Sequence, residues 1–189
     1  MSKIVILTGS KRKGGNTELL ARAFADGAGE HHEVEIIPAA DYKVNPCIGC
    51  NSCFTREGNQ CFQEDDMQLI YEKLTDAEIL VIASPVYFYG ISAQLKAVVD
   101  RLHTPMRNKF KIKKMVLLLV AGAALPFVFD SIKVQYQLIL DFFNKINGNS
   151  PSLYRWEMNH KNKLSGSGGQ ISPTDMRSKQ SGQPDKMVA

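Results

Sequence analysis

KIVILTGSKRKGGNT, residues 3–17, decides the fold of this chain. Its first six residues are short, apolar and rich in β-branched side chains, which predicts a buried strand over Lys3–Thr8. Apolar residues then recur at helical spacing and predict a helix over Asn16–Gly29, capped by Asn16 or Thr17. A strand, a glycine-containing polar loop and a helix in this order are typical of a parallel α/β sheet.

The same alternation continues through the first 147 residues. It predicts a doubly wound parallel sheet in the order 2-1-3-4-5, in three α/β/α layers. A fifth strand is expected around Leu153–Met158. The other strands are predicted over Glu33–Pro38, Ala77–Ala83 and Lys114–Val120, and the other helices from Asp65 or Asp66 to Leu74, over Ser92–Leu102 and over Asp130–Ile146.

The domain organisation follows from where this pattern begins and ends. Residues 1–160 are expected to form one domain, into which a cysteine-rich loop, residues 45–62, is inserted after the second strand. Residues 161–189 are rich in glycine, serine and proline and have few large apolar side chains. Such a composition buries little surface, so a poorly structured, mobile tail is predicted there.

Composition and charge exclude several classes of protein. The 189 residues are 44% hydrophobic and 22% charged, with a formal net charge of +4, which favours a globular domain that binds neither nucleic acid nor membrane. The longest apolar run, Met115–Phe129, contains Pro126 and is shorter than the ~20 residues of a membrane span. Because no signal peptide is recognisable, a cytoplasmic location with reduced thiols is expected.

Residues 9–17, GSKRKGGNT, form the first candidate binding site and are called the phosphate loop below. Free amides at the start of a helix attract anions, and Ser10, Asn16 and Thr17 add polar donors, while Arg12 adds a charge. The loop has neither the Gly-Lys-Ser/Thr ending of a P-loop nor a G-x-G-x-x-G pattern. The alternative is an ordinary polar loop with a positive surface.

Residues 84–92, SPVYFYGIS, follow the third strand and are called the aromatic loop. Three adjacent aromatic residues, Tyr87, Phe88 and Tyr89, cannot all face a core, and exposed aromatic clusters are typical of binding surfaces. The first and third strands flank the switch point of the sheet, where ligands bind. A phosphate site beside a stacking surface describes a mononucleotide with a large ring, such as FMN. The alternative use of the aromatic residues is a subunit interface.

The cysteine loop, residues 45–62, contains Cys47, Cys50, Cys53 and Cys61. Four thiols at this spacing can converge on one centre, and a serial Cys-x2-Cys-x2-Cys run is closer to the ligation of a [4Fe–4S] cluster than to a pair of zinc knuckles. A flavin nearby would give such a cluster an electron partner. Redox-active thiols and a zinc site remain alternative interpretations.

These three loops together resemble the NAD(P)H-dependent FMN reductase and iron–sulfur flavoprotein branch of the flavodoxin-like superfamily. The resemblance implies a flavodoxin-like fold and relatives that are homodimers or homotetramers, with FMN near a subunit interface. It implies that the ring of FMN contacts the aromatic loop and that the cysteines ligate a [4Fe–4S] cluster. The residues concerned are Ser10, Arg12, Asn16 and Thr17 for the phosphate, Pro85, Val86, Tyr87, Phe88 and Gly90 for the ring, and Cys47, Cys50, Cys53 and Cys61 for the cluster.

The function expected from this resemblance is an enzyme that passes electrons from NAD(P)H, the co-substrate, through flavin to an acceptor. Hydride transfer needs no general acid or base, so no catalytic residue is nominated. The acceptor is left open between small molecules, such as quinones, and a protein, such as a ferredoxin. The rival functions are a flavin and iron–sulfur electron carrier without nicotinamide activity, and a zinc-binding regulatory protein.

Overall fold

The structure, a computed structural model, describes residues 1–123, 125–147 and 152–159. In this part of the chain one parallel sheet has the strand order β2-β1-β3-β4-β5. Its strands are β1 (Lys3–Thr8), β2 (Glu33–Pro38), β3 (Ile79–Pro85), β4 (Lys114–Ala121) and β5 (Ser152–Asn159). The helices are α1 (Asn16–Gly29), α2 (Ser52–Thr55), α3 (Met67–Thr75), α4 (Ala93–Arg101) and α5 (Asp130–Asn147), and the 3₁₀ turns are η1 (Ala39–Asp41), η2 (Glu57–Asn59) and η3 (Pro105–Lys109).

The predicted α/β class and the order of the first four strands are confirmed, and β5 pairs in parallel with β4. The third strand begins two residues later than predicted and ends two later. Its true end is set by β4, because Ser84 and Pro85 pair with Leu119 and Val120. The short helix α2 lies within the cysteine loop and was not predicted.

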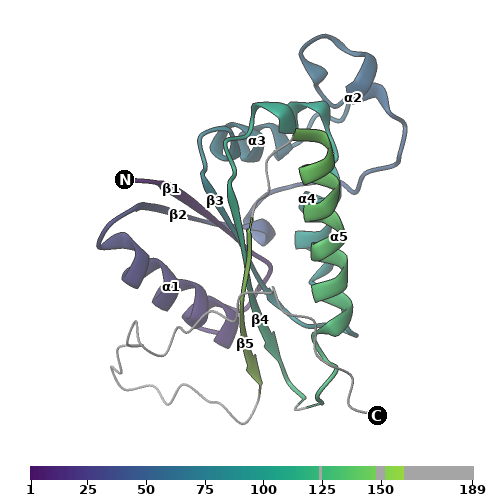
Figure 1. Cartoon of the computed structure of the whole chain (residues 1–189). Helices are drawn as coiled ribbons and strands as arrows, with labels where there is room; N and C mark the ends of the chain where they lie inside the picture. Colours follow the sequence, from purple (N-terminus) through teal and green to yellow (C-terminus); the bar gives the residue numbers. More distant parts are fainter. Residues whose placement is uncertain (124, 148–151, 160–189) are drawn as a thin grey trace, which may run out of the picture.

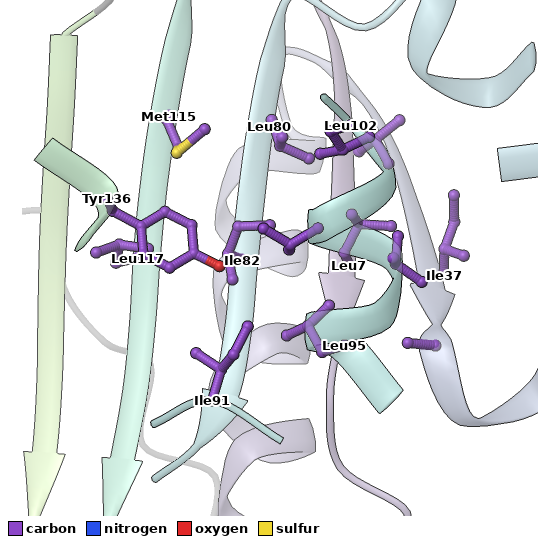
Figure 2. Close-up of a cluster of buried hydrophobic side chains, with 14 of the residues drawn as sticks. Leu7, Ile37, Leu80, Ile82, Ile91, Leu95, Leu102, Met115, Leu117 and Tyr136 are labelled. Atoms are coloured by element: carbon purple, nitrogen blue, oxygen red, sulfur yellow. The ribbon is translucent and has the colours of Figure 1, made fainter. Parts of the chain in front are cut away.

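Helices cover both faces of the sheet, as Figure 1 shows. Side chains alternate along each strand, so Val5 and Leu7 face one layer while Ile4 and Ile6 face the other. The larger core lies under α3, α4 and α5, and Figure 2 shows Leu95 and Tyr136 packed there against strand residues. The smaller core lies under α1. A rigid sheet therefore carries the loops that follow β1 and β3.

Two further expectations concern membrane-spanning helices and the C-terminal tail. Within the described ranges, none of the helices combines the length and apolarity needed to cross a bilayer. The predicted tail, residues 161–189, lies outside the described residues.

Candidate functional site

The phosphate loop and the aromatic loop leave neighbouring strands at the same edge of the sheet. Thr8, the last residue of β1, pairs with Ala83 of β3. The amide of Gly9 donates to the carbonyl of Ala83 at 2.8 Å, which ties the start of the phosphate loop to β3. The chain leaves β1 toward β2 and leaves β3 toward β4, in opposite directions across the sheet, so this is the switch point of the sheet.

Gly9 also brings the phosphate loop against the start of α4. A Cβ atom at Gly9 would lie 2.4 Å from Oγ of Ser92 and 3.0 Å from side-chain atoms of Leu95. Ser92 is buried, and its hydroxyl has no hydrogen-bond partner among the described residues. Only a glycine allows this approach, which places the loop over the amino-terminal end of a second helix.

The prediction that Asn16 or Thr17 caps α1 is wrong. The N-cap residue is Gly15, which has an extended backbone and directly precedes Asn16, the first helical residue, and no side chain caps the helix. Glu18 in the first turn instead accepts a hydrogen bond from the amide of Gly14 at 2.7 Å and pairs with Arg22. The first amides of α1 are therefore left for another acceptor.

The four predicted phosphate contacts lie together on this loop, but they differ in exposure. Arg12 and Asn16 are exposed, Ser10 is half-buried, and Thr17 is buried. The hydroxyl of Ser10 accepts a hydrogen bond from the amide of Arg12 at 3.2 Å, which curls the chain. Lys11 and Lys13 are exposed beside them, so the loop carries a positive surface around the uncapped start of α1.

The aromatic loop folds back on itself as a tight hairpin. Tyr87 and Gly90 exchange two backbone hydrogen bonds, of 2.9 and 3.0 Å. The two central residues, Phe88 and Tyr89, have φ of 46° and 64°, as in a type I′ turn, where glycine or asparagine is usual. Backbone strain of this kind concentrates at functional sites. It presents Phe88 at the tip with 98% of its surface exposed.

The other predicted ring contacts lie deeper in the same loop. Pro85 is buried at the end of β3, and Val86 is half-buried and donates its amide to the carbonyl of Val120 at 2.8 Å. Tyr87 is 52% exposed, and Gly90 is half-buried. The loop therefore offers backbone groups near the sheet and aromatic rings further out.

Sequence reasoning missed an aromatic residue next to this loop. Phe127, which follows β4, stacks on Tyr89 with ring centroids 6.0 Å apart and an interplanar angle of 25°. The carbonyl of Tyr89 also accepts a hydrogen bond from the hydroxyl of Ser131 at the start of α5. The alanine-rich segment after β4 suggested no role, and only its proximity to Tyr89 identifies Phe127.

The four cysteines lie on one loop as free thiols. Cys47 and Cys50 are exposed, whereas Cys53 and Cys61 are half-buried. A contact of 3.3 Å with the hydroxyl of Ser52 holds the pKa of the Cys50 thiol below its usual value. Among the described residues, no three histidine, cysteine or acidic side chains are gathered closely enough to hold a metal ion.

Two adjacent aspartates close the stem of the cysteine loop. Asp65 accepts the amide of Asn45 at 2.9 Å, and Asp66 accepts the amide of Lys43 at 2.6 Å. The amide of Asp66 donates back to the carbonyl of Lys43 at 3.0 Å. Sequence reasoning assigned these aspartates only to the start of a helix. Their pairing with residues 20 and 23 positions earlier had no local signal.

A buried ion pair lies beneath this stem. Arg101, at the end of α4, pairs with Asp65, and their side chains are 3% and 0% exposed. The hydroxyl of Tyr71 donates to the carbonyl of Arg101 at 2.6 Å, and burial raises the pKa of Tyr71 to about 12. The sequence did contain a signal for this pair, an arginine at the end of an otherwise apolar helix face, but sequence reasoning did not consider it.

The structure separates the cysteine loop from the other two loops. Gly9 packs at the amino end of α4, and the stem of the cysteine loop contacts Arg101 at its carboxyl end, about 13 Å away for nine residues. In Figure 1, α2 lies at the opposite end of the molecule from the arrowheads of β4 and β5. Within one chain, the cysteine loop therefore lies at the other end of α4 from the candidate flavin site.

A groove of about 990 Å³ lies between α4 and α5. Its lining includes Val99, His103 and Leu138, together with the amino-terminal half of β3. None of the residues predicted to contact FMN or a cluster lines it. The groove is therefore separate from both candidate sites.

The residues present fit the groups that the sequence suggested. For a phosphate, the uncapped start of α1 and the cations around it supply donors. For an iron–sulfur cluster, four unpaired thiols form the appropriate donor set. Positive φ at Gly49, Asn51, Gly58 and Asn59 shows that the cysteine loop already reverses direction between its thiols. The stem of the loop is held by the hydrogen bonds of Asp65 and Asp66.

Comparisons with known proteins identify a family and several relatives of this chain. The family model of NADPH-dependent FMN reductase matches residues 2–156. An iron–sulfur flavoprotein of Methanocaldococcus jannaschii is 42% identical over 115 residues, 60% of this chain and 58% of that protein. Another, of Methanosarcina thermophila, is 38% identical over 124 residues, 65% of this chain and 61% of that protein.

Solved structures agree at the level of the fold. An NAD(P)H:quinone oxidoreductase from Methanothermobacter marburgensis superposes with a TM-score of 0.66 at 16% identity, over 88% of this chain and 87% of that chain. This likeness extends the flavodoxin-like architecture to most of the chain. The match of the family model over residues 2–156 shows that the chain belongs to the NADPH-dependent FMN reductase family.

Proposed function

We propose that this chain binds FMN at the switch point of its sheet and passes electrons from NAD(P)H to an acceptor. The observation that carries the proposal is the meeting of two features at one edge. The uncapped start of α1, with its exposed cations, lies beside a strained hairpin that exposes Phe88. One feature suits a phosphate and the other a planar ring.

The chain's own residues would bind and orient the flavin, while bound FMN supplies the hydride-accepting ring. Ser10, Arg12, Asn16 and Thr17 are proposed to hold the phosphate. The ring is proposed to contact Pro85, Val86, Tyr87, Phe88 and Gly90. Exposed aromatic residues at the tip of the hairpin also suit a subunit contact in a homo-oligomer.

The phosphate assignment predicts the effect of two substitutions. Arg12→Ala and Asn16→Ala are each expected to weaken FMN binding, by roughly 10- to 100-fold for Arg12, because a hydrogen bond to a charged group contributes about 1.5–3 kcal/mol. Titrating apoprotein into FMN and following the flavin fluorescence measures the dissociation constant. Lys111→Ala, which removes an exposed cation paired with Asp76, is the control and should leave it unchanged. Unchanged affinity in both loop variants would exclude this phosphate site.

We further propose that Cys47, Cys50, Cys53 and Cys61 ligate a [4Fe–4S] cluster. The donor set supports this, and so do the relatives, whose names describe iron–sulfur flavoproteins. Protein purified without oxygen is expected to combine flavin bands with a broad iron–sulfur absorbance and about four irons per chain. Iron and sulfide assays on the same sample check the count. Flavin bands alone after attempted reconstitution would leave an FMN reductase with redox thiols, and stoichiometric zinc would favour the regulatory alternative.

The second candidate function is an electron carrier that receives electrons from a protein. It is favoured by one observation, the separation of the cysteine loop from the flavin edge, because a partner could then reach each site independently. Steady-state oxidation of NADH and NADPH distinguishes the two functions. A reductase oxidises at least one of the two nucleotides, and a carrier oxidises neither.

A further inference from the structure

The buried pair of Arg101 and Asp65 needs an explanation beyond stability. Replacing a buried ion pair with apolar residues is often neutral or stabilising, because removing two charges from water costs more than their attraction returns. Here both side chains are almost fully buried, and the pair lies directly beneath the stem of the cysteine loop. A buried pair at this location suggests that its role is to position the cysteine loop above it.

The hydrogen bonds of the pair converge on one residue of the stem. Asn45 donates its amide to Asp65 at 2.9 Å, and its carbonyl accepts from Arg101 at 3.5 Å. The second carboxylate oxygen of Asp65 accepts the amide of Met67 at 3.2 Å, which starts α3. Arg101 and Asp65 therefore join α4 and α3 to the residue that enters the cysteine loop.

More contacts bring the far side of the loop to the same helix end. The hydroxyl of Thr104 donates to the carbonyl of Asn59 at 3.4 Å, and the side-chain amide of Asn59 donates to the carbonyl of Cys53 at 3.2 Å. The rings of Phe54 and His103 lie 5.8 Å apart. The loop thus rests on the carboxyl end of α4 rather than projecting freely.

Arg101 also carries a buried donor that the stem does not use. Its Nε is buried and has no hydrogen-bond partner among the described residues. A buried donor without a partner is rare and costly, so stability alone does not account for an arginine at this position.

We propose that Arg101 is a positioning residue for the cysteine ligands: through Asp65 and Asn45 it holds the stem of the cysteine loop closed. The consequence for iron rests on the cluster proposed above. A cluster is retained only while its four thiols stay together, so a closed stem should slow the loss of iron. Because Asp65 balances the charge of Arg101, the pair acts through its hydrogen bonds and not through a net charge.

Three variants test this role. Arg101→Lys keeps the positive charge but loses the guanidinium, whose Nη1 donates to both Asp65 and Asn45. The double variant Arg101→Met with Asp65→Asn removes both charges, so it leaves no buried unpaired ion and is expected to fold. Lys96→Met is the matched control, because it breaks the exposed pair with Asp100 on the same helix.

The full chain with its cluster gives one readout. In the double variant and in Arg101→Lys, iron release to a chelator should be at least tenfold faster than in the Lys96→Met control. Because the double variant removes one positive and one negative charge, faster release there reports the lost hydrogen bonds and not a change in net charge. A double variant that matches the control would overturn the proposal.

The closing of the loop can be tested without iron. The amide of Lys43 reports on the stem, because its acceptor, Asp66, is unchanged in every variant. Its hydrogen exchange in iron-free protein should be at least tenfold faster in the double variant and in Arg101→Lys than in the control. A wild type that binds no iron would refute the proposed cluster, whereas unchanged exchange at Lys43 would refute the role of Arg101.

Discussion

Replacing Asp65 with alanine is expected to lower the free energy of unfolding by about 3–5 kcal/mol. The substitution leaves the guanidinium of Arg101 buried without its carboxylate. It also removes the acceptor for the amides of Asn45 and Met67, which are part of the loop stem and of the start of α3. Urea unfolding followed by circular dichroism measures the change.

The matched control for this prediction is Asp76→Ala. Asp76 also pairs with a cation, Lys111, but the two side chains are 63% and 64% exposed. Exposed pairs contribute little to stability, so the control should lose far less stability than Asp65→Ala. Equal losses in the two variants would mean that Arg101 finds another partner and that burial of the pair has no energetic consequence.

Replacing Gly9 with alanine is expected to affect both stability and FMN binding. The new methyl group would overlap Oγ of Ser92 at 2.4 Å and press on Leu95, and neither neighbour can move freely at the start of α4. Overpacking of this kind costs about 1–3 kcal/mol. Because the phosphate loop must shift to relieve the overlap, the dissociation constant of FMN should rise by at least about tenfold, which corresponds to about 1.4 kcal/mol.

Gly29→Ala is the control for this second prediction. Gly29 ends α1, and a Cβ atom there would meet nothing within 4 Å. The substitution should be neutral or should stabilise the chain by up to about 1 kcal/mol, because alanine restricts the unfolded chain. Unfolding curves and flavin titrations on both variants check the pair. Matching results for Gly9→Ala and Gly29→Ala would contradict the tight contact between the phosphate loop and α4.

Much of the fold followed from local pattern. The apolar run Lys3–Thr8 and the helical spacing in Asn16–Gly29 were both found as predicted. These signals are reliable because each element buries one face, so apolar residues recur at the spacing of a strand or a helix within a short stretch of sequence. Boundaries were less reliable, as the end of β3 shows, because pairing with β4 and not the sequence of β3 itself sets that end.

The candidate flavin site was predictable for a different reason. Once the sheet order is inferred, the rule for switch points brings together the loops after β1 and β3. Thr8 and Ala83, which pair there, are 75 positions apart in the sequence. The side chains on these loops could then be read directly. The cap of α1 could not, because Gly15 competes with Asn16 and Thr17 at a position where all three residue types are acceptable.

By itself the sequence determined the α/β alternation, the meeting of the phosphate and aromatic loops, and the presence of four cysteines on one loop, because each depends on local pattern or on a general rule of topology. Only the tertiary structure decided that Asp65 meets Arg101, that Phe127 stacks on Tyr89, and that the cysteine loop lies at the far end of α4. These contacts join residues 36 or more positions apart. Which partners meet at such separations is set by how helices pack on the sheet, and no local pattern encodes it.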